Sequence, residues 1–269
     1  MSRISERFAS RRAEDRRVLV GYLVAGDPAP ETTVPAMHAL VAGGTDVIEL
    51  GLPFTDPEGE GPDIQAGHER SLAAGTRVAD VLSMIRTFRE RDAQTAIVLM
   101  GYVNLVERMG AERFAREASA AGADGAILVN LPPEEAAELS GAFAEAGLDL
   151  ILLVAPTTTD ERARRILAST TGFSYYVSLK GTTGAGHLDV DAVRTRLGEL
   201  RAFTELPLAV GFGIRDGESA RAVAEFADAV VVGSAIVRRM GEGDGADGAL
   251  FTELEAFARE LRSAIDADG

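Results

Sequence analysis

The 269-residue sequence contains no cysteine and no tryptophan, and Lys180 is its only lysine. Without cysteine the chain forms no disulfide. It also offers neither a thiolate nucleophile nor a thiolate ligand for zinc or an iron–sulfur cluster. Any catalysis must therefore depend on other groups.

Positive charge is also scarce, because 27 basic residues face 42 acidic ones and the formal net charge is −15. This excess repels nucleic-acid phosphates and anionic membrane surfaces, so neither is an expected partner. The apolar runs are about eight residues long, far short of the roughly 20 needed to span a bilayer. The N-terminus lacks the apolar stretch of a signal peptide. We therefore expect a cytoplasmic protein.

Short apolar runs recur along the chain, with amphipathic helical patterns between them. The eight runs begin at Val18, Val47, Ala96, Gly125, Asp149, Phe173, Pro207 and Ala229. Strands that are apolar on both faces and alternate with helices are typical of a parallel sheet covered by crossover helices. The pattern predicts an α/β fold in which eight units close into a (β/α)8 TIM barrel. The structural alternative is an open doubly wound sheet.

We expect residues 1–269 to form a single domain, with an extra helix inside residues 1–17 before the barrel and a frayed tail at 265–269. Residues 239–248 are expected to form a loop. Helices are predicted at 2–13, 30–42, 62–90, 111–121, 133–146, 159–169, 189–202, 216–226 and 246–264.

An internal repeat supports a chain of βα units. The segments that end in Asp46, Asp124 and Asp149 each close a helix with glycine and place the aspartate just before the next strand; Asp228 ends a weaker copy. These aspartates are expected at the N-terminal face of the barrel, where a loop-capping role is more common than a functional one. We interpret them as structural.

The connection after the second strand is unusually long. The second and third strands are predicted to start 49 residues apart, whereas the other spacings are 22 to 34 residues. The insertion reads PFTDPEGEGPDIQ from Pro53, and a second extended connection covers Lys180–Asp189. Both are expected to open on the C-terminal face, where the βα loops of barrel enzymes form the active site.

Glu49 is the strongest single candidate for chemistry, because it lies inside the apolar segment VIELG near the end of a predicted strand. Desolvation there raises the pKa of a carboxyl towards the range of general acid–base catalysis. The alternative is a buried carboxyl neutralised by hydrogen bonds. The next loop adds Asp56, Glu58, Glu60 and Asp63. One of these is expected to approach Glu49 and share acid and base roles with it, and the others to be solvated or to cap a helix.

Aromatic side chains are concentrated in the predicted strands. All four tyrosines lie there: Tyr22, Tyr102, Tyr175 and Tyr176. Alternation points one member of the last pair into the barrel and the other towards the helices. Together with Met100 and Leu153, the inward tyrosines would accept a flat apolar ring, although a plain hydrophobic core is the alternative.

Glycines stand where the sixth, seventh and eighth predicted strands end. The positions are Gly184, Gly213 and Gly233, the last followed by Ser234. Backbone N–H groups at such points, helped by a helix N-terminus, form the phosphate cradle common in this fold. The alternative is a set of tight βα turns.

The three histidines, His38, His68 and His187, do not have the spacing of metal ligands. We interpret His38 as a helix-face residue and expect no role for the other two. No P-loop and no G-x-G-x-x-G follows a strand. We therefore expect neither a metal nor a cofactor.

Several segments together match one family pattern. They read ELGLPFTDP from Glu49, GPDIQ from Gly61, AGDP from Ala25, YVN from Tyr102, SLKGTTG from Ser178, GFGI from Gly211 and GSAIV from Gly233. In these segments, which are spread over nearly its whole length, the chain resembles the tryptophan synthase α subunit family.

The resemblance implies a retro-aldol cleavage of indole-3-glycerol phosphate to indole and glyceraldehyde 3-phosphate, without a cofactor. It also implies an α2β2 complex in which indole passes to a pyridoxal-phosphate-dependent β subunit. By position in the family pattern, Glu49 is the acid–base residue, Glu60 serves the indole nitrogen and Tyr175 is the active-site tyrosine. The implied phosphate site is Gly184, Gly213, Gly233 and Ser234. The residues implied to hold the indole ring and neighbouring parts of the substrate are Tyr22, Met100, Tyr102, Leu153 and Phe212.

The chain departs from the family within residues 53–62, which we call the catalytic loop. The family reads P-F-S-D-P-x-A-D-G-P, so Gly59 replaces an alanine and Glu60 an aspartate. Asn130 stands for an aspartate and Thr182 for a valine. The side chain of Glu60 is one methylene longer and must fold back or shift the loop; a misplacement of about 1 Å can cost on the order of 100-fold in rate.

Three functions remain open from the sequence. The first is an active α subunit that its β partner stimulates. The second is a catalytically weak α-like subunit kept for binding and regulation, and the third is a stand-alone indole-releasing lyase.

Overall fold

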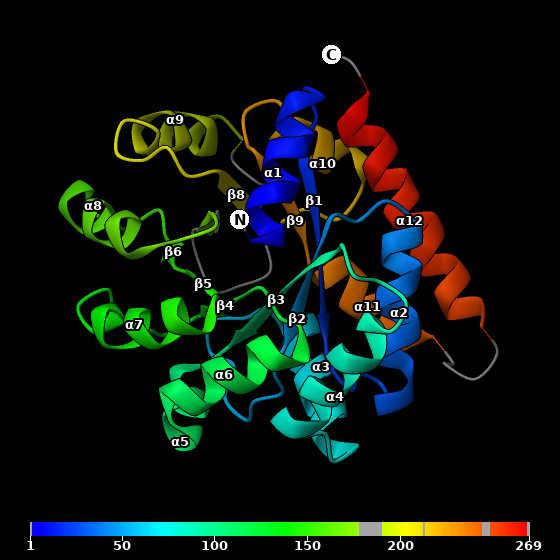
Figure 1. Ribbon diagram of the computed structural model, residues 1–269. Coiled ribbons are helices and arrows are strands. Elements are labelled where there is room, and N and C mark those ends of the chain that lie inside the picture. The colour runs from blue at the N-terminus through cyan, green and yellow to red at the C-terminus, as the bar shows by residue number, and fades with distance from the viewer. Residues whose placement is uncertain (1, 178–189, 212, 244–247, 268–269) are drawn as a thin grey trace.

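The computed structural model describes residues 2–177, 190–211, 213–243 and 248–267 (Figure 1). Nine strands pair in parallel in the order β5-β4-β3-β2-β1-β9-β8-β7-β6. They are β1 Val18–Val24, β2 Val47–Gly51, β3 Ala96–Gly101, β4 Gly125–Leu128, β5 Asp149–Ile151, β6 Leu153–Val154, β7 Ser174–Val177, β8 Leu208–Gly211 and β9 Ala229–Val232. Only Leu152 separates β5 from β6, the two ends of this order. The sheet is therefore a nearly closed barrel, as predicted, and not an open doubly wound sheet.

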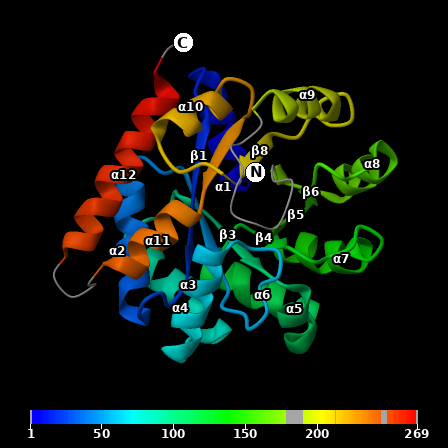
Figure 2. The same ribbon diagram turned by 180° about the vertical axis from the view of Figure 1, so that it is seen from behind.

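Helices surround the strands in both views (Figures 1 and 2). They are α1 Arg3–Ala13, α2 Pro30–Ala42, α3 Pro62–Ala73, α4 Val78–Arg89, α5 Val103–Met109, α6 Ala111–Ala121, α7 Ala136–Ala146, α8 Asp160–Ser169, α9 Val190–Leu200, α10 Gly217–Ala224, α11 Ser234–Glu242 and α12 Ala249–Asp266. The last helix, α12, packs beside α2 and α10 (Figure 1). Within the described residues, no helix is long and apolar enough to cross a membrane.

Two apolar layers hold the barrel together. The inner layer fills the barrel and includes Val20, Val98 and Tyr175. The outer layer lies between strands and helices and includes Tyr176, so the expected alternation of the tyrosine pair is confirmed. The α1 helix adds Phe8 to the inner layer, 5.5 Å from the ring of Phe173 between centroids. The extra N-terminal helix therefore closes the bottom of the barrel.

Two helix predictions are wrong in the region of the second and third βα units. The single helix predicted over 62–90 is two helices, α3 and α4. Gly75 lies just beyond α3 at φ +82°, the left-handed conformation that ends a helix. The short helix α5, which begins directly after Tyr102, was not predicted.

Boundaries also differ near the C-terminus. The apolar run that starts at Ala229 is strand only to Val232, and Ser234 begins α11, because a short apolar run does not distinguish a buried strand from a buried helix face. Residues 239–242, predicted as loop, lie in α11, and α12 continues to Asp266, into the segment expected to be a tail.

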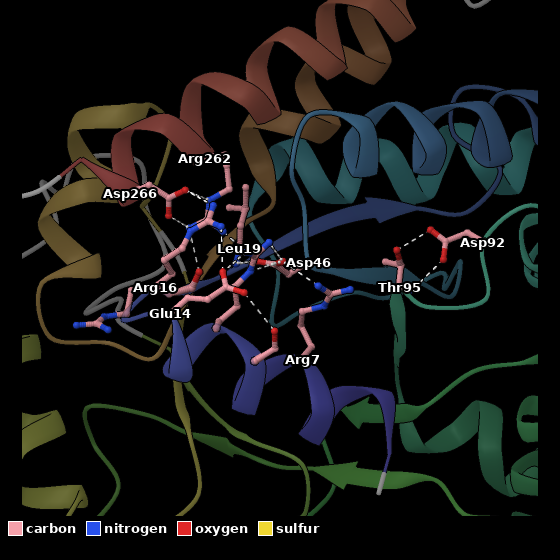
Figure 3. Close-up of polar contacts among 12 residues, drawn as sticks. Arg7, Glu14, Arg16, Leu19, Asp46, Asp92, Thr95, Arg262 and Asp266 are labelled. Atoms are coloured by element: carbon pink, nitrogen blue, oxygen red, sulfur yellow. Dashed lines mark hydrogen bonds and ion pairs between the residues drawn. The ribbon is translucent and has the colours of Figure 1, made fainter.

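The repeated aspartates lie at the N-terminal face and hold strand ends. Asp46 accepts a hydrogen bond from the Leu19 N–H at 3.0 Å (Figure 3). Asp124 accepts one from Ile97 N–H and Asp228 one from Leu208 N–H, each at 2.8 Å. Each of these three carboxylates precedes one strand and accepts a backbone N–H from the first or second residue of the neighbouring strand. Asp149 accepts from the Ser2 hydroxyl. The predicted structural role is confirmed.

Candidate active site

A cavity opens where the strands end, and we call it the central cavity. Its lining residues are Tyr22, Glu49, Glu60, Ile64, Met100, Tyr175, Gly213, Ile214, Val231, Gly233 and Ser234. Strand register explains part of this set: Tyr22 on β1 is paired with Glu49 on β2. Residues side by side in a parallel sheet point to the same face, so both side chains enter the barrel.

The central cavity contains most of the predicted site residues. Glu49, Glu60, Tyr175, Tyr22, Met100, Gly213, Gly233 and Ser234 line it together. Tyr102 does not line the central cavity, but its hydroxyl contacts Glu60. Leu153 packs against the inner apolar layer and does not line the central cavity. Gly184 and Phe212 lie outside the described residues, as does the predicted loop Lys180–Asp189.

Glu49 is almost completely buried, with 1% of its surface exposed. Neither carboxyl oxygen has a hydrogen-bond partner among the described residues, so no hydrogen bond within this part of the chain neutralises the carboxyl. Desolvation, with a smaller effect of the Glu60 charge, raises the pKa of Glu49 to about 8. Glu49 is therefore a protonated acid at neutral pH.

Glu60 reaches back into the central cavity, as its extra methylene requires. Its Oε2 accepts hydrogen bonds from the Tyr22 hydroxyl at 3.3 Å and from His68 Nε2 at 3.0 Å. Its Oε1 accepts from the Tyr102 hydroxyl at 3.3 Å. The Gln65 amide holds its backbone carbonyl at 2.9 Å. Glu60 thus presents a buried, well-satisfied carboxylate across from Glu49.

The other carboxylates of this loop do not reach the central cavity. Asp56 and Glu58 are exposed, and Asp63 forms an ion pair with Arg238 at 2.7 Å. Of the four loop carboxylates that were candidates to approach Glu49, only Glu60 lines the central cavity.

Two glycines make room for the tyrosine hydroxyls. A Cβ on Gly211 would lie 2.0 Å from the Tyr175 hydroxyl oxygen, and a Cβ on Gly51 would lie 2.4 Å from that of Tyr22. Burial raises the pKa of Tyr175 well above its ordinary value, and the charges of Glu49 and then Glu60 add to this effect. Burial likewise raises the pKa of Tyr22, with added effects of Glu60 and then Glu49. Both tyrosines therefore remain neutral and can donate a hydrogen bond.

A second, outer cavity adjoins the glycine-rich end of the central cavity. Gly213, Ile214 and Ser234 line both, and Arg215 and Arg238 line the outer one. Gly213 has φ +78°, and Ser234 is the first residue of α11. The positive end of the α11 dipole and these small residues form a site suited to a phosphate group.

Sequence reasoning missed four residues of this region. Ile64, Ile214 and Val231 line the central cavity, and His68 binds Glu60. His68 stands four residues after Ile64 on α3, so both lie on the helix face turned to the barrel. That spacing was the available signal. The described residues contain no group of three or more His, Asp or Glu that could hold a metal ion.

Asn130, which departs from the family pattern, contacts the start of α5 and does not line the central cavity. Its Oδ1 accepts from the Val103 N–H at 2.8 Å and its Nδ2 donates to Asn104 at 3.1 Å. It therefore holds the first turn of α5. Thr182, the other departure outside the catalytic loop, lies outside the described residues.

The fold and the site define a (β/α)8-barrel enzyme that combines a buried acid, a second carboxylate and a cradle for an anionic group. The comparisons with known proteins give the family. A family model described as tryptophan synthase alpha chain matches residues 8–266. The chain belongs to the tryptophan synthase alpha chain family, and it is a lyase of tryptophan biosynthesis.

Individual relatives agree with this assignment. The tryptophan synthase alpha chain of Nitrosococcus oceani is 51% identical over 267 residues, which cover 99% of this chain and 98% of that protein. That of Thioalkalivibrio sulfidiphilus is 52% identical, over 99% of this chain and 100% of that protein. The crystal structure of the alpha subunit from Legionella pneumophila superposes with a TM-score of 0.91 at 43% identity, covering 99% of both chains. Tryptophan synthase of M. tuberculosis in its aminoacrylate-bound form gives 0.88 at 37% identity, over 98% of this chain and 100% of that one.

Proposed function

We propose that this chain cleaves indole-3-glycerol phosphate by a retro-aldol reaction, releasing indole and glyceraldehyde 3-phosphate, with Glu49 as the acid–base residue. The observation that carries the proposal is the buried Glu49 carboxyl, which has no hydrogen-bond partner in the described part of the chain. It shares with the Glu60 carboxylate a cavity that ends at Gly213, Gly233 and Ser234. The indole passes to a β subunit, in an α2β2 complex. The biosynthetic role supports the cytoplasm as the location.

Proton transfer in the proposed reaction balances on Glu49 alone. Protonated Glu49 gives its proton to indole C3, and the positive charge that develops on the ring nitrogen faces the Glu60 carboxylate. Ionised Glu49 then takes the proton of the side-chain hydroxyl. The C–O bond becomes a carbonyl, the bond to C3 breaks and its electrons return to the ring, so Glu49 ends protonated again.

The remaining side chains orient the substrate. Tyr22 and Met100 offer apolar surface for the indole ring, and the neutral hydroxyl of Tyr175 is a donor for the glycerol part. A phosphate group bound near Gly213, Gly233 and Ser234 fixes the end of the substrate that is remote from the ring. This contact holds the reacting atoms in the orientation that the reaction needs. Tyr102 acts through its hydrogen bond to Glu60. The same roles are proposed for Leu153 and Phe212 at the ring and Gly184 at the phosphate, on the resemblance alone.

The direct test is release of indole by the purified chain, with and without a β subunit. We expect indole in both cases and faster turnover with the β subunit, because loop closure on partner binding completes such sites. No indole in either case would leave a regulatory subunit as the function. Fast turnover that no β subunit changes would indicate a stand-alone lyase.

The pH dependence of kcat/KM should show the titration of Glu49. Only the protonated acid can begin the reaction, so activity is retained below the raised pKa and lost as the pH rises through it. With the pKa at about 8, kcat/KM is expected to fall about tenfold per pH unit above that value. A profile measured with the isolated chain that stays flat to about pH 9.5 would contradict the role of Glu49 as the initial acid.

Shortening Glu60 to aspartate should lower the rate. The longer side chain reaches three donors, on β1, α3 and the end of β3; an aspartate retracts the carboxylate by about one bond length. We expect kcat for Glu60→Asp to fall by about 10- to 100-fold. Glu58→Asp, an exposed change in the same loop, is the matched control. A higher rate for Glu60→Asp would mean that the extra methylene is a defect to which the loop has not adapted.

A further inference from the structure

We propose that His68 is a positioning residue that fixes the Glu60 carboxylate and ties it to the backbone of the catalytic loop. This inference deepens the proposed function and rests on it. His68 is 2% exposed and lies on α3. Both of its ring nitrogens are engaged in hydrogen bonds.

The hydrogen bonds of His68 determine its tautomer. The backbone N–H of Phe54 donates to Nδ1 at 3.2 Å. Because a backbone N–H can only donate, Nδ1 carries the lone pair and the ring proton is on Nε2. Nε2–H therefore donates to Glu60 Oε2, at 3.0 Å, and the Tyr22 hydroxyl lies 3.4 Å from the same nitrogen. The imidazole is a neutral bridge from the loop backbone to the carboxylate.

The same loop is fixed a second time at its other end. The Gly59 N–H donates to the Tyr102 hydroxyl oxygen at 3.3 Å, and that hydroxyl donates to Glu60 Oε1. The Phe54 ring stacks on the Tyr102 ring, with centroids 4.6 Å apart. Each Glu60 oxygen is therefore connected to one end of the segment 54–59, through His68 at one end and Tyr102 at the other.

The length of Glu60 explains why this chain needs such a bridge. A glutamate side chain has one more rotatable bond than an aspartate, so more conformations must be excluded to hold its carboxylate at one place. Tyrosine hydroxyls rotate and follow the acceptor, whereas the imidazole of His68 is a rigid ring held at both nitrogens. His68 therefore sets the direction of the carboxylate, and the tyrosines complete its hydrogen bonding.

Two substitutions separate the two bonds of His68. Counted in bonds from Cα, the amide nitrogen of glutamine stands where Nε2 stands, and the amide oxygen of asparagine stands where Nδ1 stands. His68→Gln keeps the donor to Glu60, and His68→Asn keeps only the acceptor for Phe54. We expect His68→Asn to lower kcat for indole release by about 10- to 100-fold with KM within about threefold, and His68→Gln to stay within about fivefold in kcat.

Thermal unfolding of both variants checks that each is folded. Equal losses in kcat for the two variants, or no loss for His68→Asn, would overturn the positioning role while leaving the proposed function intact. Absence of indole release by the unsubstituted chain would instead refute the proposed function.

A spectroscopic measurement tests His68 independently of activity. The chain has 3 histidines, so ¹⁵N-labelled histidine gives a spectrum that His68→Asn can assign. We expect the Nε2-protonated tautomer for His68 at neutral pH, and a change in its Nε2 signal in Glu60→Ala. The Nδ1-protonated tautomer, or a signal that Glu60→Ala does not change, would show that the bridge does not exist.

Discussion

Replacing Glu49 with glutamine is expected to lower kcat for indole release by at least about 100-fold, the usual contribution of a proton transfer by a positioned side chain. Binding should change little. Because the pKa of Glu49 is raised to about 8, the wild-type group is neutral at pH 7. An amide of the same shape therefore replaces a neutral acid, and the cavity keeps its form and charge.

The decisive measurement for Glu49→Gln is the separation of kcat from KM, together with the affinity for a non-cleavable indole alkyl phosphate. A loss confined to kcat identifies an interaction needed in the transition state, whereas a loss confined to KM identifies ground-state binding. Glu58→Gln, in the exposed part of the same loop, should retain wild-type kcat in the isolated chain. A Glu49→Gln variant with more than about a tenth of the wild-type rate would contradict the proton-transfer role.

The barrel could be predicted from the sequence because its strands are buried on both faces. A run such as that from Ala96 is apolar throughout. Its recurrence between amphipathic helical patterns indicates a parallel sheet that helices cover on both faces. The limits of the prediction were local. Leu152 interrupts the fifth strand, and the left-handed Gly75 divides one predicted helix into two. Both features depend on backbone geometry that hydrophobic periodicity does not record.

Part of the candidate active site could also be predicted from the sequence, and part of it could not. Glu49 could be found from the sequence because a carboxylate in an apolar strand is costly unless it has a use. The choice of Glu60 among the loop carboxylates came from the family pattern, and the structure supplies its physical basis in three donors. The spacing of His68 from Ile64 could place its ring on the barrel side of α3. Its bond to Glu60 could not be predicted, because that bond depends on how the loop folds back.

The opposite end of the barrel offers the largest expected effect on stability, at Asp46. This carboxylate is 2% exposed and lies among the cations of two terminal helices (Figure 3). Arg11 of α1 donates twice to Oδ1, at 2.8 and 2.7 Å. Arg262 of α12 donates to Oδ2 at 2.9 Å, and the Leu19 N–H donates to the same atom. Asp46 therefore joins α1, α12 and β1.

Asp46→Ala should lower the free energy of unfolding by about 3 kcal/mol, because it leaves Arg11 and Arg262 without a central partner and the Leu19 N–H buried and unpaired. The matching fall in Tm is about 6–12 °C for a chain of this size. Asp46→Asn keeps an acceptor for Leu19 but loses the charge, so its loss should be intermediate. Glu145→Ala, an exposed change on α7, should leave Tm within about 1–2 °C.

The position of Asp46 makes a second readout decisive. The carboxylate holds the N-terminal ends of the strands, whereas Glu49 and Glu60 lie at the C-terminal ends. Below its lowered Tm, Asp46→Ala should therefore cleave indole-3-glycerol phosphate with wild-type kcat and KM, because local repacking at the bottom of the barrel leaves the central cavity in place. A Tm close to that of the wild type would show that Arg262 is satisfied by Asp266 alone. A normal Tm loss combined with a lower kcat would show instead that the two ends of the barrel are coupled through β2.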